Sequence, residues 1–126
     1  MITDIAVDWS DATKSSVFVS FGGQSSDRHR VWRFDGTKWE ARSGPDVGPN
    51  LLNVEHNAIV VDPAAPTNVY AAADIGVWHS ADSGMTWETL ENGLPESPVY
   101  DILIHPTQRL LRAATHGRGV YEFPLP

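Results

Sequence analysis

The sequence predicts an all-β fold built from about three small antiparallel sheets, and three observations support this. A similar strand ending occurs three times along the chain, at 5–9, 59–63 and 102–106, which indicates an internal repeat. Five Trp, ten Gly and nine Pro in 126 residues favour short strands separated by turns. The run 54–61 lacks the 3.6-residue spacing of apolar side chains that an amphipathic helix needs.

The strands are expected in the same order in each repeat. After each strand ending and its polar turn, a second strand is expected at 16–22, 68–73 and 109–115, and a third at 30–34, 76–80 and 119–123. A valine followed by an aromatic residue recurs in the third strands, at Val31-Trp32, Val77-Trp78 and Val120-Tyr121. Such pairs suit sheets that are packed on both faces. Trp32, Trp39, Trp78 and Trp87 recur at matching places of the repeats and are expected in the core.

The repeats form one predicted domain, 1–126, which consists of three repeats at 1–48, 54–92 and 98–126. The strand inventory is four, four and three, because the last repeat ends before an outer strand. The exposed edge would then be 120–123, which Pro124 and Pro126 protect from further pairing.

The clearest local motif is a hairpin turn in the middle repeat, with Ser80, Asp82, Gly84, Thr86 and Trp87 at its defining positions. The Asp82 carboxylate can accept hydrogen bonds from main-chain N–H groups of its own turn. Gly84 can adopt a positive φ, and Ser80 and Thr86 can join the two arms beneath the Trp87 ring. A calcium site is disfavoured because Asp82 is the only carboxylate in the turn.

This Ser-x-Asp-x-Gly-x-Thr-Trp pattern resembles the Asp-box of BNR-repeat proteins, which include sialidase-like, xyloglucanase-like and sortilin-like β-propellers. The segment 62–70, with Asp62, Pro63 and Pro66 before Val69-Tyr70, is a second BNR-like feature. The first repeat keeps a shortened box at 34–39. The resemblance implies propeller blades whose outer two strands are joined by the box, and it implies no particular activity.

Three blades are too few to close a propeller, which needs roughly four to eight. The uncovered faces of the first and last blades would carry apolar side chains. We therefore expect a homodimer that joins blade 1 of one copy to blade 3 of the other in a six-bladed ring. The alternative is the C-terminal part of a larger propeller, because 114–121 resembles the closing blade of large BNR-repeat proteins.

Candidate ligand-binding residues lie in the loops that follow the second strands, where related propellers bind their ligands. They are Asp27, Arg28, His29, Asp74, His116 and Arg118. Further loops at 44–53 and 92–96 would border the same rim. Polar groups around a ring mouth suit a small polar ligand such as a sugar, although charged residues also collect in solvated loops without binding anything.

No catalytic residue is assigned. A glycosidase needs two carboxylates across one sugar bond, and no spacing singles out a pair among Asp27, Asp46, Asp74 and Glu96. The five histidines show no pairing typical of a metal site, and cofactor-binding motifs are missing from the sequence. The expected function is a non-enzymatic scaffold or interaction module, with a carbohydrate-binding module or a glycoside hydrolase remnant as alternatives.

Composition limits the partners and the compartment. The net charge is −7 with scattered basic residues, which argues against nucleic acid and anionic membrane surfaces. There is no cysteine, so no disulfide framework is expected. The sequence has no signal-peptide pattern and no apolar run of membrane-spanning length, so a cytoplasmic protein is expected as it stands, although relatives of this type are often secreted.

Overall fold

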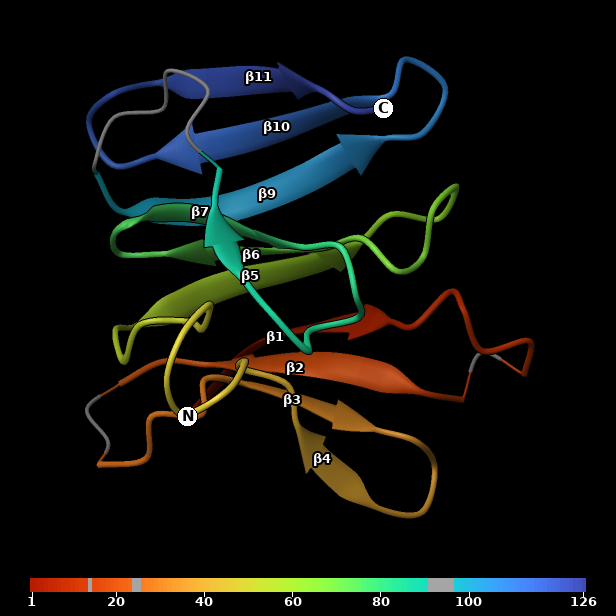
Figure 1. Ribbon diagram of the computed structural model, residues 1–126. Helices are drawn as coiled ribbons and strands as arrows, with labels where there is room; N and C mark the ends of the chain where they lie inside the picture. The colour runs from red at the N-terminus through yellow and green to blue at the C-terminus, as the bar shows by residue number, and fades with distance from the viewer. Residues whose placement is uncertain (14, 24–25, 91–96) are drawn as a thin grey trace.

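The computed structural model describes residues 1–13, 15–23, 26–90 and 97–126, and these form three antiparallel sheets stacked one on the next (Figure 1). The first sheet contains β1 (Ile2–Val7), β2 (Val17–Phe21), β3 (Val31–Phe34) and β4 (Trp39–Ala41). The second contains β5 (His56–Val61), β6 (Val69–Ala73), β7 (Gly76–Ser80) and β8 (Glu88–Thr89). The third contains β9 (Val99–His105), β10 (Leu110–Thr115) and β11 (Val120–Pro124).

The strand inventory confirms the all-β prediction of four, four and three strands. Within each sheet the strands follow one another in chain order, and every neighbouring pair is antiparallel. The described residues contain no helix, and hence none long and apolar enough to cross a membrane.

The pairing registers make residues of different sheets equivalent. In the first sheet, Ile5 pairs with Val19, and Val19 pairs with Trp32. In the second sheet the same row contains Ile59, Ala71 and Trp78. In the third sheet, Ile102 is equivalent to Ile5 and Ile59, and the row of Leu103, Arg112 and Glu122 lies on the face opposite Ile102. Because side chains alternate across a strand, each row belongs to one face of its sheet.

The core lies in two layers, one on each side of the second sheet. Phe18 and Val31 of the first sheet pack in one cluster with Ile59, Trp78 and Trp87. On the other face of the second sheet, a separate cluster contains side chains of the second and third sheets: Ala58, Tyr70, Ala72, Val77, Val99, Ile102, Leu111, Ala113 and Phe123. All five residues of β6 are buried, so the second sheet is covered on both faces.

Polar contacts also join neighbouring sheets. The Ile59 N–H donates to Asp4 Oδ2 at 3.0 Å, and Thr3 Oγ1 donates to the His56 carbonyl oxygen at 2.7 Å. On the other side, Arg109 of the third sheet makes a two-pronged contact with Asp62, at 2.7 and 2.6 Å. These contacts fix how each sheet sits on the next.

The first and third sheets each have one uncovered face. Ile5 is 62 % exposed and Trp39 is 50 % exposed on the free face of the first sheet. Leu103 and Val120 are 50 % and 67 % exposed on the free face of the third. The prediction of a buried Trp39 was therefore wrong, and Trp32 is only partly buried, since no sheet covers that side. Trp78 and Trp87 are buried as expected.

Candidate functional site

The turn at 80–87 is closed by hydrogen bonds among its own residues. Asp82 Oδ1 accepts from the Thr86 N–H at 2.8 Å, and Asp82 Oδ2 accepts from the Thr86 hydroxyl at 2.6 Å. Ser80 Oγ donates to Asp82 Oδ1 at 2.8 Å and accepts from the Gly84 N–H at 2.8 Å. Partial burial raises the pKa of Asp82, but the hydrogen bonds from Thr86 and Ser80 outweigh it, so the carboxyl stays ionised at neutral pH.

The same turn locks the second sheet against the first. Trp87 Nε1 donates to the Arg42 carbonyl oxygen at 2.7 Å, and its ring is 2 % exposed. Gly84 has φ +87°, and a Cβ there would lie 2.8 Å from Arg42 Cβ. Glycine is therefore needed at this position both for its backbone conformation and for the close approach of Arg42. This turn is a structural joint between sheets.

The loops expected to form a binding rim lie at one end of the stack. The β2–β3, β6–β7 and β10–β11 connections are at the same end in Figure 1, and the turns after β1, β5 and β9 are at the other. The predicted site residues Asp27, Arg28, His29, Asp74, His116 and Arg118 belong to these loops. The predicted rim segments 24–25 and 92–96 lie outside the described residues.

The structure brings only some of these residues together. Arg28 is drawn to the 44–53 loop, where its NH2 group donates to Asp46 Oδ1 at 2.6 Å and to the Gly44 carbonyl oxygen at 3.1 Å. Asp27 and His29 line a hollow on the rim of the first sheet. His116 is in the third sheet, where its ring lies against Tyr100 with centroids 5.3 Å apart.

A polar hollow lies between the first and second sheets at this rim. Its lining includes Arg30, Asn53, Glu55 and Asp74, with Gly23 at one side. Arg30 is 4 % exposed and donates from Nε to Asn53 Oδ1 at 2.8 Å and from NH1 to the Gly23 carbonyl oxygen at 2.8 Å. Glu55 Oε1 accepts from the Gly23 N–H at 2.8 Å.

Of the four polar residues of this hollow, Asp74 was predicted as a site residue and Asn53 ends the predicted rim loop 44–53, whereas Arg30 and Glu55 were not predicted. Arg30 was assigned to the start of a strand, and Glu55 lies in a long connection without a motif. An arginine directly before a buried strand was the available signal, because a buried cation needs hydrogen-bond partners nearby. Two carboxylates beside one guanidinium can bind hydroxyl or ammonium groups of a ligand.

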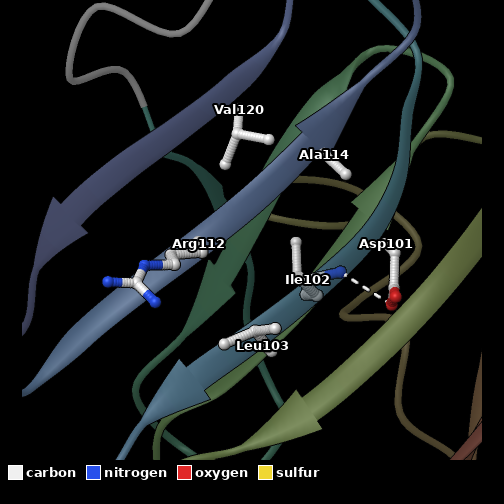
Figure 2. A pocket seen from close by; sticks show the side chains of 6 residues that line it. All are labelled: Asp101, Ile102, Leu103, Arg112, Ala114 and Val120. Carbon is white, nitrogen blue, oxygen red and sulfur yellow. Dashed lines mark hydrogen bonds between the residues drawn. The ribbon is translucent and has the colours of Figure 1, made fainter.

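A third hollow, of about 140 Å³, lies on the free face of the third sheet. Figure 2 shows the six side chains that line it, from β9, β10 and β11: Asp101, Ile102, Leu103, Arg112, Ala114 and Val120. Its surface is mostly aliphatic. Among the described residues, no group of His, Asp and Glu side chains could hold a metal ion.

No protein-family model and no curated protein matches this sequence. Solved structures are similar in fold. An ancestral GH74 enzyme is 16 % identical with a TM-score of 0.67, over 90 % of this chain and 16 % of that one. A GH74 xyloglucanase from Xanthomonas campestris is 16 % identical with a TM-score of 0.65, over 96 % of this chain and 22 % of that one.

A gluconolactonase from the same organism is 14 % identical with a TM-score of 0.63, over 99 % of this chain and 38 % of that one. At such identities the likeness shows the fold alone. The three sheets are consecutive blades of a partial β-propeller, and the chain spans well under half of each of these structures. Membership of the Asp-box family stays a prediction.

Proposed function

We propose that this chain is a non-enzymatic Asp-box propeller module that serves as a scaffold or interaction surface, and that two copies close into one six-bladed ring. The blades at 1–48, 54–92 and 98–126 sweep about half of such a ring. Blade 1 of each copy then covers blade 3 of the other, which satisfies two-fold symmetry.

One observation carries this proposal. The second sheet has one face that packs on the first sheet. The free face of the first sheet has equivalent residues at the same positions. Ile59 and Trp87 are 1 % and 2 % exposed on the covered face, whereas Ile5 and Trp39 are 62 % and 50 % exposed on the free one. Exposed apolar faces of this kind mark contact surfaces. Among the described residues, the side chains of the Asp82 turn hydrogen-bond to one another and support the fold.

The test is the mass of the purified chain in solution. Sedimentation equilibrium over a wide concentration range should give twice the mass of one chain, with dissociation on dilution. A well-folded monomer at all concentrations would contradict the ring. Addition of oligosaccharide substrates serves as the control for activity, since turnover that depends on Asp27 or Asp74 would instead support the glycoside hydrolase alternative.

A second candidate function is carbohydrate binding at the rim. The hollow between Arg30, Glu55 and Asp74 supports it, as does the xyloglucanase among the similar structures. Titration with xyloglucan oligosaccharides, followed by amide NMR shifts, should then perturb Gly23 and Asp74. Glu55→Gln should abolish the shifts, and Glu88→Gln, an exposed position on the outer strand β8, should not. Binding that instead requires His116 and Arg118 would place the ligand on the third sheet, and absence of shifts would contradict this function.

A further inference from the structure

The hollow on the third sheet is built from positions that form sheet contacts elsewhere in the chain. Val120 is equivalent to Val31 and Val77, which are 0 % and 2 % exposed in the two existing contacts. Leu103 is equivalent to Ala6 and Val60, which pack against the two core clusters. The free face of the third sheet therefore repeats a contact surface that the chain uses twice already.

A polar group of the existing contact is repeated as well. Asp4 Oδ1 accepts from the Ile5 N–H at 2.8 Å, and its Oδ2 accepts from Ile59 of the next sheet at 3.0 Å. Asp101 occupies the place of Asp4, and its Oδ1 accepts from the Ile102 N–H at 2.9 Å in the same way (Figure 2). The carboxylate at the edge of the hollow thus has the local arrangement that joins the first two sheets.

The opposing side chains follow from the same equivalence. In the contact between the first and second sheets, Phe18 and Val31 pack in one cluster with Ile59 and Trp78. The positions equivalent to Ile59 and Trp78 in the first sheet are Ile5 and Trp32, on its free face. Ile5 is 62 % exposed and Trp32 is only partly buried, with its ring against His29, and these side chains are the ones that fit the hollow of another copy.

We infer that the hollow of Figure 2 receives Ile5 and Trp32 of a second copy of this chain, with Ile5 against Leu103 and the guanidinium of Arg112 over the Trp32 ring. This contact rests on the proposed ring and specifies its register. Arg112 occupies the place of Phe18 and Tyr70, whose rings pack inside the existing contacts. A cation over an indole face is attracted to it, so an arginine can replace an aromatic ring there.

The occupant is a second copy because both halves of the contact are present on one chain. The free face of the third sheet is equivalent to the face of the first sheet that packs on the second sheet. The free face of the first sheet is equivalent to the face of the second sheet that packs on the first. Arg112 donates from Nε to Glu122 Oε1 at 2.9 Å, and its side chain is 37 % exposed on the free face of the third sheet. A partner without an aromatic residue opposite Arg112 would fit this surface less well.

Two charge substitutions test the register. Ile5→Lys and Leu103→Glu each place one unpaired charge in both contacts of the dimer, and each should weaken dimerisation on the order of 100-fold. An equimolar mixture of the two variants should dimerise again, because one contact is then native and the other pairs Lys with Glu. Met85→Lys and Met85→Glu are matched controls, since Met85 is 57 % exposed on a turn away from both free faces.

The outcomes separate this inference from the ring itself. A dimeric wild-type chain whose single variants stay dimeric, or whose mixed variants stay monomeric, overturns the register and leaves the ring. A monomeric wild-type chain overturns both. Circular dichroism reports whether each variant folds. If either does not fold, Arg112→Gln takes its place, with dimerisation weakened about threefold to tenfold and Trp fluorescence changed on association. Unchanged affinity and fluorescence would overturn the register.

Discussion

The turns at 34–39 and 80–87 occupy the same place in consecutive sheets, and they differ in what covers them. Asp35 Oδ1 accepts from the N–H groups of Thr37 and Lys38, each at 2.9 Å, much as Asp82 accepts from Thr86. Yet Trp87 is 2 % exposed against Arg42, whereas Trp39 is 50 % exposed and its ring packs on Phe34, with centroids 4.9 Å apart.

Local hydrogen bonds therefore form in both turns, and burial of the tryptophan depends on a neighbouring sheet. Each turn forms its own hairpin hydrogen bonds, but only the turn at 80–87 also contacts a neighbouring sheet through its tryptophan. The free turn of the first sheet shows what the second would look like without a partner. Four experiments compare covered and uncovered positions of equivalent sheets.

The largest expected effect is from removing the two tryptophans. Trp87→Ala should lower the free energy of unfolding by about 3–5 kcal/mol, because it empties a fully buried site. Trp39→Ala in dilute solution should lower it by less than about 1 kcal/mol, because half of that ring is already in water. Urea unfolding at low and high protein concentration measures both. Equal effects in dilute solution would break the comparison.

Acid should destabilise the contact between the first and second sheets, where His56 is buried. His56 is buried, whereas the equivalent Ile2 of the first sheet is 56 % exposed. Burial lowers the pKa of His56 from 6.5 to about 4, so the folded state binds this proton less readily than the unfolded chain. Stability is then complete above pH 6.5 and falls by about 3 kcal/mol as the pH drops toward 4.

NMR titration of the imidazole signals checks this prediction directly. The His56 ring should stay neutral at pH 5.5. Unfolding free energies at pH 7 and pH 5 should show the loss in the wild type and a smaller one in His56→Gln, which removes the titrating group. A His56 signal that titrates near pH 6.5 would be inconsistent with a buried, neutral side chain.

A smaller effect distinguishes two ion pairs at equivalent positions. Asp62 pairs with Arg109 of the next sheet, whereas Asp8 pairs with Arg33 of its own sheet, with Nε 2.8 Å from Oδ2. Arg109→Met should destabilise the chain by about 2 kcal/mol at pH 7, since it leaves a buried carboxylate without its cation.

The pH dependence of that variant follows from the pKa of Asp62. Arg109 lowers this pKa, so the contact stabilises the fold above pH 3.8 and loses its effect as the pH falls through the lowered value. Thermal melts between pH 7 and pH 3 should show the variant approaching wild type in acid. Limited proteolysis should release the third sheet in Arg109→Met but not in Arg33→Met. A constant difference across pH would contradict a role for the charge.

The smallest difference concerns two glycines at equivalent places in the turns. Gly36 and Gly84 both have positive φ, but an added Cβ meets nothing within 4 Å at Gly36 and lies 2.8 Å from Arg42 Cβ at Gly84. Gly36→Ala should lower stability by about 1 kcal/mol from backbone strain alone. Gly84→Ala should lower it by about 1 kcal/mol more, as measured by urea unfolding, and equal losses would show that the sheet contact yields freely.

At the rim, only part of the side-chain arrangement could be predicted from the sequence. Asp74 was predicted there and lines the hollow between the first two sheets, but Arg30 and Glu55 beside it were not. Arg28 was predicted as a ligand contact, and its pairing with Asp46, 18 positions away, was not predicted. Such pairings depend on how loops from separate strands meet, which no local pattern records.

Residue types and spacing were sufficient to predict the strand count, the turn of Asp82 and its hydrogen-bond acceptor role, since these involve neighbours within a few positions. Whether Trp87 or Trp39 is buried, and which cation meets Asp62, was settled by the stacking of sheets. Contacts between residues more than 40 positions apart, such as Trp87 with Arg42 and Arg109 with Asp62, exist only once the chain has folded. Similar turns therefore have different surroundings in consecutive sheets, because solvent is excluded only where another sheet packs on the turn.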